Sequence, residues 1–184
     1  FHHTQREAAS TPPHLLVTFG GYDEDNLALA AMKELAGLET PFTATVICSA
    51  DAHGLEEAQA FAAPHGEKFR VLPPTHMAPL MAAVDLALCA GGTTSLEMAA
   101  LGVPMVLVTV ADNQEPGAAA LDHAECARLA GRGVGALGPA TKILDDLIRD
   151  SAAREDMSRA GTALVDGRGA ERIAEAMHAG ITPS

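Results

Sequence analysis

A cluster of small and hydroxyl residues after an apolar run is the part of this chain best suited to bind a phosphate. The cluster comprises Gly91, Gly92, Thr93, Thr94 and Ser95. Glycines let the backbone approach an anion closely, and the first amides of a helix are donors without an intrahelical partner. Glu97 follows about one turn later, where a carboxylate could accept hydrogen bonds from ribose hydroxyls. The spacing therefore predicts a nucleotide site.

The same residues allow a purely structural interpretation. Residues 94–97 match the capping-box pattern Ser/Thr-x-x-Glu, in which a hydroxyl and an acid close the start of a helix. One capping hydroxyl, Thr93 or Thr94, together with one glycine would satisfy a helix start. The chain has two glycines and three hydroxyl residues there, which is more than a cap needs. Taken alone, the motif leaves both interpretations open.

Two more loops with small or polar residues follow predicted strands. Gly20 and Gly21 come after the apolar run 14–19, either as a turn facing a phosphate or as an ordinary strand-to-helix turn. Asp112, Asn113 and Gln114 follow the run 105–110; Asp112 could be an N-cap, and the amides could bind sugar hydroxyls. Ligands of open parallel sheets bind at the carboxyl ends of strands. The convergence of the three loops predicts one nucleotide-sugar crevice.

The elements that must position these loops form an α/β pattern. Apolar runs without alternating polarity, separated by helical patterns, predict a Rossmann-like, doubly wound parallel sheet of about six strands. The predicted strands are 14–19, 42–48, 69–72, 85–89, 105–110 and 134–137. The predicted helices are 27–35, 55–63, 77–84, 94–101, 116–130, 140–150, 151–164 and 169–179. Residues 1–13 are expected to form a linker or arm, and residues 14–184 the nucleotide-sugar-binding domain.

Composition excludes several classes of partner. The net charge of -12 disfavours nucleic acid and anionic membranes, and no apolar run reaches the ~20 residues that span a bilayer. Three widely spaced cysteines predict buried reduced thiols and a cytoplasmic setting. Neither a metal-ligand spacing nor a cofactor fingerprint is present, so no metal and no cofactor are expected. No general base stands out, and His76 is the only histidine near the predicted crevice.

Several motifs together resemble a known family. Gly-Gly-Thr-Thr-Ser-x-Glu at 91–97, Ala-Leu-Gly-Val-Pro at 100–104 and Asp-Asn-Gln at 112–114 are similar to the donor-binding C-terminal half of GT-B nucleotide-sugar enzymes. Segments 16–23, 77–87 and 164–170 extend the resemblance over residues 14–178. Among these enzymes, the chain looks most like the UDP-sugar hydrolases of pseudaminic acid synthesis and their relatives in spore-coat polysaccharide synthesis. Asp112-Asn113-Gln114 together with the segment Asp166-Gly167-Arg168-Gly169 favours the hydrolase branch.

The resemblance implies a role for each matched residue. The diphosphate would meet the two glycine turns, Glu97 would hold the ribose, the backbone near Met77 would contact uracil, and Asn113 and Gln114 would contact the sugar. The predicted nucleotide- and diphosphate-binding residues are Gly20, Gly21, Met77, Gly91, Gly92, Thr93, Thr94, Ser95 and Glu97. The predicted sugar-binding residues are Asp112, Asn113 and Gln114.

The resemblance also implies that the catalytic group lies elsewhere. In the resembled hydrolases, the base that activates water is a His in a Gly-x-Gly-His loop of the N-terminal domain, a pattern that this chain lacks. The chain is therefore expected to be the C-terminal half of a longer UDP-sugar hydrolase, which partners its own N-terminal domain and is inactive alone. That enzyme would release UDP from a UDP-linked diacetamido-trideoxy hexose by attack of water at the anomeric carbon. The alternatives are the donor-binding half of a UDP-sugar glycosyltransferase and a non-catalytic nucleotide-binding module.

Overall fold

A single parallel sheet organises the molecule. The structure is a computed structural model that describes residues 10–20, 23, 25–48 and 52–180. Its six strands lie in the order β3-β2-β1-β4-β5-β6, and all pairs are parallel. The strands are β1 (His14–Thr18), β2 (Thr43–Ile47), β3 (Phe69–Leu72), β4 (Leu86–Ala90), β5 (Met105–Thr109) and β6 (Ala127–Arg132). This confirms the predicted Rossmann-like, doubly wound α/β fold.

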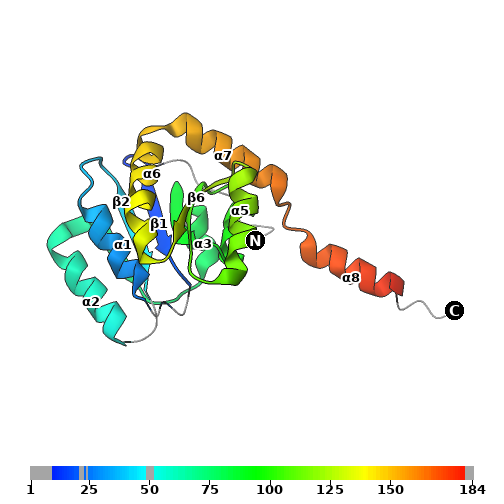
Figure 1. Cartoon of the computed structure of the whole chain (residues 1–184), viewed down its shortest axis with the longest axis horizontal. Coiled ribbons are helices and arrows are strands. Elements are labelled where there is room, and N and C mark those ends of the chain that lie inside the picture. Colours follow the sequence, from blue (N-terminus) through cyan, green and yellow to red (C-terminus); the bar gives the residue numbers. More distant parts are fainter. Residues whose placement is uncertain (1–9, 21–22, 24, 49–51, 181–184) are drawn as a thin grey trace.

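Helices cover both faces of the sheet, as Figure 1 shows. One apolar cluster joins α1 (Leu27–Ala36), α2 (Ala52–Ala62) and α6 (Leu137–Arg149) to the sheet. The other joins α3 (Met77–Ala82), α4 (Thr93–Ala100) and α5 (Glu115–His123) to the opposite face. Because side chains alternate along a strand, Leu88 packs in the first cluster and its neighbour Cys89 in the second. Burial on both faces explains why the central strands lack polar alternation.

The helix α7 (Ser151–Leu164) crosses from one layer to the other. It follows α6 directly and packs against α4 at Gly161, where the two backbones approach closely. A Cβ atom at Gly161 would lie 2.9 Å from the carbonyl oxygen of Ala99. The contact therefore fixes the position of α4, the helix on which the predicted phosphate-binding residues lie.

The last helix lies apart from the sheet. In Figure 1, α8 (Gly169–Gly180) extends away from the body beyond α7, and its residues 169–178 are exposed. The turn before it is held by its own ion pairs: Arg172 donates to Asp166, and Arg168 to Glu171. The bond from Arg172, followed by one from the backbone amide of Arg168, holds the pKa of Asp166 down at about 2. Arg168 and Arg172 thus anchor the final helix.

The end of the sheet differs from the sequence-based prediction. The helix expected over 116–130 ends at His123, and the strand expected at 134–137 is a 3-10 turn, Val134–Ala136. The sixth strand is β6, which begins at Ala127. The chain leaves α5 through Glu125 in the left-handed region (φ 60), and the Asp122 carboxylate accepts the Leu129 amide at 2.9 Å. Pairing with β5, including a bulge opposite Leu107 and Val108, thus overrides a segment with good helix propensity.

Two observations bear on the predictions that were made from composition, one on apolar helices and one on the cysteine thiols. Among the residues that the structure describes, no helix is both long and apolar enough to span a bilayer. The side chains of Cys48, Cys89 and Cys126 are buried thiols, as predicted.

The thiol of Cys89 gives a pH-dependence of stability. Burial raises its pKa from 9.0 to about 12. Between these values the unfolded chain loses a proton that the folded chain keeps, so the free energy of unfolding must fall as pH rises above 9. We expect a loss of about 1 kcal/mol between pH 9 and 10, measured by urea unfolding.

The slope of the free energy of unfolding against pH shows whether Cys89 causes this loss. A Cys89→Ala variant should have a flatter profile above pH 9, whatever its stability at pH 7. A Cys126→Ala variant is the comparison: burial also raises the pKa of Cys126, but by less than that of Cys89, so Cys126→Ala should flatten the profile less. Identical slopes for the wild type and Cys89→Ala would refute the assignment.

Candidate functional site

The predicted loops follow neighbouring strands at the carboxyl edge of the sheet. Strands β1, β4 and β5 are adjacent and parallel, so the segments after Thr18, Ala90 and Thr109 leave the same edge. Side-chain packing confirms that two of them touch. A Cβ atom at Gly91 would lie 3.5 Å from the Cβ of Gln114, and one at Gly92 would lie 3.9 Å from its Nε2. The turn after β4 and the loop after β5 therefore form one continuous wall.

The turn after β4 leaves a helix end open. Helix α4 begins at Thr93, its N-cap is Gly92, and no side chain caps it. The Oγ of Ser95 instead donates to the carbonyl oxygen of Gly92 at 2.6 Å. Both Thr93 and Thr94 therefore lie inside the first turn, and the capping interpretation of these two hydroxyls is wrong. The first amides of the helix have no capping side chain, as an anion-binding end requires.

Glu97 is not the acid of a capping box. A capping box needs the acid at the third helical position, and here Ser95 holds that position. The Glu97 carboxylate is half-buried and makes no hydrogen bond or ion pair with any residue that the structure describes. A carboxylate without a structural partner, one turn from an open helix end, is available to a ligand.

In the loop after β1, unlike the turn after β4, a side chain already caps the helix that follows. Asp23 is buried (8 % exposed), and its two carboxylate oxygens accept the amides of Leu27 and Ala28, each at 2.8 Å. The N-terminus of α1 is thus already occupied by an internal anion. Gly20 has a φ of 94°, which favours glycine, and open space around its Cβ position. Gly21 lies outside the described residues.

The loop after β5 is held from two sides. The Oε1 of Gln114 accepts the backbone amide of Val110 at 2.9 Å, which leaves its Nε2 directed at the β4 turn. The side chain of Asp112 is exposed and pairs with Arg132. Asn113 is exposed between them, within the short 3-10 helix η2 (Asp112–Gln114).

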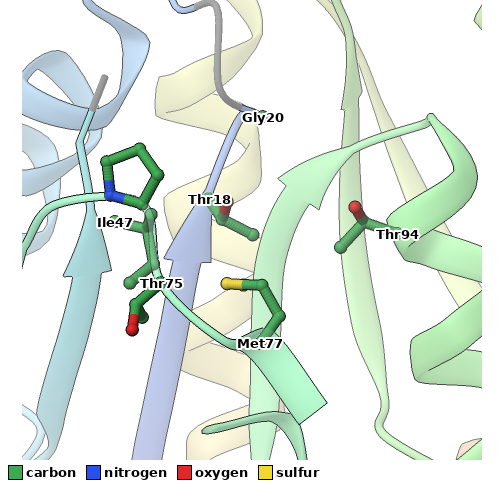
Figure 2. A pocket seen from close by; sticks show the side chains of 7 residues that line it. Thr18, Gly20, Ile47, Thr75, Met77 and Thr94 are labelled. Atoms are coloured by element: carbon green, nitrogen blue, oxygen red, sulfur yellow. The ribbon is translucent and has the colours of Figure 1, made fainter. Parts of the chain in front are cut away.

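A small hollow opens beside these loops. Its volume is about 120 Å³, and Figure 2 shows the side chains of Met77 and Thr18 between the 74–75 segment and Thr94. The lining residues are Thr18, Gly20, Ile47, Pro74, Thr75, Met77 and Thr94. Gly20, Met77 and Thr94 were predicted as site residues.

The other four lining residues were not predicted, and the sequence carries a signal for two of them. Thr18 and Ile47 are the last residues of adjacent parallel strands, in register with each other, so they must end at the same edge. The segment Pro74–Thr75 precedes α3 and has no comparable sequence signal. His76 is the exposed N-cap of α3, outside the lining. Within the described part of the chain, no group of three or more His, Cys, Asp or Glu side chains could hold a metal ion.

The fold and the site together define a class of protein. The parallel sheet of this strand order, with helices on both faces, matches the Rossmann-like C-terminal half of GT-B proteins. The model of the family described as glycosyltransferase family 28 C-terminal domain matches residues 14–137. The chain therefore belongs to this family.

Individual relatives agree with this placement. The Bacillus subtilis (strain 168) spore coat polysaccharide biosynthesis protein SpsG is 28% identical over 167 residues, 87% of this chain and 48% of the relative. The structure of Acinetobacter baumannii MurG matches 97% of this chain and 53% of its own, with a TM-score of 0.75 and 21% identity. UDP-GlcNAc 2-epimerase from Neisseria meningitidis, solved bound to UDP-GlcNAc, covers 90% of this chain and 43% of its own, with a TM-score of 0.65 and 17% identity. The chain spans about half the length of these proteins.

The comparisons support one of the two predicted enzyme classes, the glycosyltransferase, and not the other, the hydrolase. The matched family is one of glycosyltransferases, which supports the alternative of a glycosyltransferase domain. They give no support to the hydrolase prediction or to a link with pseudaminic acid. The spore-coat resemblance, in contrast, is matched by the SpsG relative.

Proposed function

We propose that this chain is the donor-binding half of a glycosyltransferase that uses a UDP-sugar. The observation that carries the proposal is the open N-terminus of α4 and, one turn further on, the Glu97 carboxylate, which has no partner among the described residues. It supplies donors for an anion and an acceptor for sugar hydroxyls within the segment that matches the glycosyltransferase family.

Each part of the donor has a proposed contact. The diphosphate binds the amides and hydroxyls of Gly92, Thr93 and Thr94. The ribose hydroxyls donate to Glu97. The uracil ring enters the hollow beside Met77, where apolar and hydroxyl side chains lie together.

The sugar lies towards the loop after β5. The Nε2 of Gln114 and the exposed amide of Asn113 are its proposed partners, because Gln114 contacts the β4 turn. Gly20 adds space on the opposite side. Asp23 blocks the end of α1, so the proposal assigns the diphosphate to α4 alone.

The acceptor and the catalytic base are proposed to belong to the half that this chain does not cover. At the anomeric carbon, an acceptor hydroxyl forms the new bond and UDP leaves with the electron pair of the broken bond. Donors at the start of α4 stabilise the charge that develops on the diphosphate.

The proposal is tested by titration calorimetry of UDP, CMP, ADP and GDP into this chain. We expect UDP to bind tightest and inorganic phosphate to compete. Absence of UDP binding at millimolar concentration would refute the proposal. Incubation with UDP-sugars should release no UDP from this chain alone; release without an acceptor would instead favour a hydrolase.

A further inference from the structure

Arg132, the last residue of β6, bridges two carboxylates of the neighbouring loop. Its Nη1 donates to Asp112, and to the Oε1 of Glu115 at 3.0 Å. Asp112 is the first residue of η2, and Glu115 is the first residue of α5. One guanidinium therefore joins the two residues that flank Asn113 and Gln114.

The inner side of the same loop is fixed independently. The Oε1 of Gln114 accepts the Val110 amide, and the Gln114 amide donates to the Ala111 carbonyl at 3.0 Å. The loop is thus held by the side chain of Gln114 within the crevice and by Arg132 on the outside. Asn113 lies between these two attachments, and its own side chain is exposed.

The bridge also balances charge. Asp112 and Glu115 place two carboxylates at the rim of a site proposed for an anionic diphosphate, in a chain of net charge -12. The guanidinium lies against both carboxylates and offsets their mutual repulsion, so the three charges hold the loop together. Exposed ion pairs are individually weak, but these two share one guanidinium and join three elements, β6, η2 and α5.

We infer that Arg132 is a positioning residue for the sugar of the donor, and that Asp112 acts as its anchor and makes no sugar contact. The guanidinium holds η2 so that Asn113 and Gln114 face the crevice. The inference rests on the proposed function. It assigns Arg132 no contact with UDP itself.

The test compares UDP with UDP-N-acetylglucosamine in wild type and in Arg132→Gln. We expect the affinity for UDP to stay within about twofold, while the affinity for UDP-N-acetylglucosamine falls about fivefold, the scale of one exposed ion pair. Asp112→Asn should likewise weaken UDP-N-acetylglucosamine but not UDP. Arg132→Lys should keep part of the affinity for UDP-N-acetylglucosamine that Arg132→Gln loses. A merely structural defect would weaken both ligands equally.

Arg128→Gln is the matched control. It removes the same charge from the same strand, but Arg128 donates only to the carbonyl of Ala127 in the described contacts. We expect no change for either ligand. Equal losses in the two variants would overturn the inference, as would equal wild-type affinity for UDP and UDP-N-acetylglucosamine.

Hydrogen exchange separates this inference from the proposed function. Backbone amides of residues 111–115 in the free chain should exchange about fivefold faster in Arg132→Gln than in wild type, because the loop opens more easily. Unchanged exchange would overturn the inference even where UDP binds. Faster exchange in a chain that does not bind UDP would refute the proposed function and leave Arg132 as a loop anchor without a ligand role, which would also overturn the inference.

Discussion

UDP binding is expected to weaken about 10- to 100-fold when Glu97 is replaced by alanine, because a hydrogen bond to a charged group contributes roughly 1.5–3 kcal/mol. The carboxylate is half-buried and has no structural partner among the described residues, so its removal deletes the ribose contact alone. The N-cap of α4 is Gly92, so the free energy of unfolding should change by less than about 0.5 kcal/mol. Calorimetry and urea unfolding measure the two quantities.

Two controls identify the ribose as the partner. In wild type, 2′-deoxy-UDP should bind more weakly than UDP, and in Glu97→Ala the two should bind alike. Glu57→Ala removes the same charge from an exposed site on α2 and should leave UDP affinity unchanged. Wild-type affinity in Glu97→Ala would contradict the ribose assignment, and a large loss of stability would show that Glu97 closes the helix after all.

Gly161→Ala is expected to destabilise the fold by about 2–3 kcal/mol, the scale of overpacking in a close contact. The added Cβ would lie 2.9 Å from the Ala99 carbonyl oxygen and 3.4 Å from the Ala99 Cα. Both atoms belong to the backbone of α4, so relief requires the whole helix to move. Because Thr93, Thr94 and Glu97 lie on that helix, UDP affinity should also fall. Urea unfolding and calorimetry measure these effects.

Gly117→Ala is the matched control for this substitution. Gly117 also lies inside a helix, α5, and a Cβ there meets nothing within 4 Å. Alanine is the better helix former, so we expect a gain of about 0.5–1 kcal/mol. A Gly161→Ala variant as stable as Gly117→Ala would contradict the close α4–α7 contact.

Most of the fold could be predicted from the sequence because its four central strands are buried on both faces. Continuous apolar runs such as Leu86–Ala90 and Met105–Thr109 can only be satisfied between two layers of helices. The edge strand β6 lacks this signal. Its sequence, ARLAGR, has no β-branched residue and is only partly buried, so local propensity favours a helix there. Because β6 was not predicted, the position of Arg132 was not predicted either. Only the pairing of β6 with β5 brings Arg132 beside Asp112.

The residues of the candidate site also differ in how far the sequence could predict them. Gly91 to Glu97 stood out because two glycines and three hydroxyl residues exceed what a helix start needs. A capping box of Thr94 and Glu97 requires Thr94 as the N-cap, and the N-cap of α4 lies two positions earlier, at Gly92. Asp23 was missed as the cap of α1 because it lies four positions before Leu27, the first residue whose amide it accepts, a spacing without a common motif.

The amino-acid sequence by itself determined the layers, the parallel sheet and the carboxyl-edge loops, because apolar patterning and strand-end chemistry are local properties. The tertiary structure alone decided which groups are available to a ligand. It assigned the start of α1 to Asp23, left the start of α4 open, and placed Arg132 against Asp112 and Glu115. These outcomes depend on contacts between elements, which no local pattern in the chain specifies.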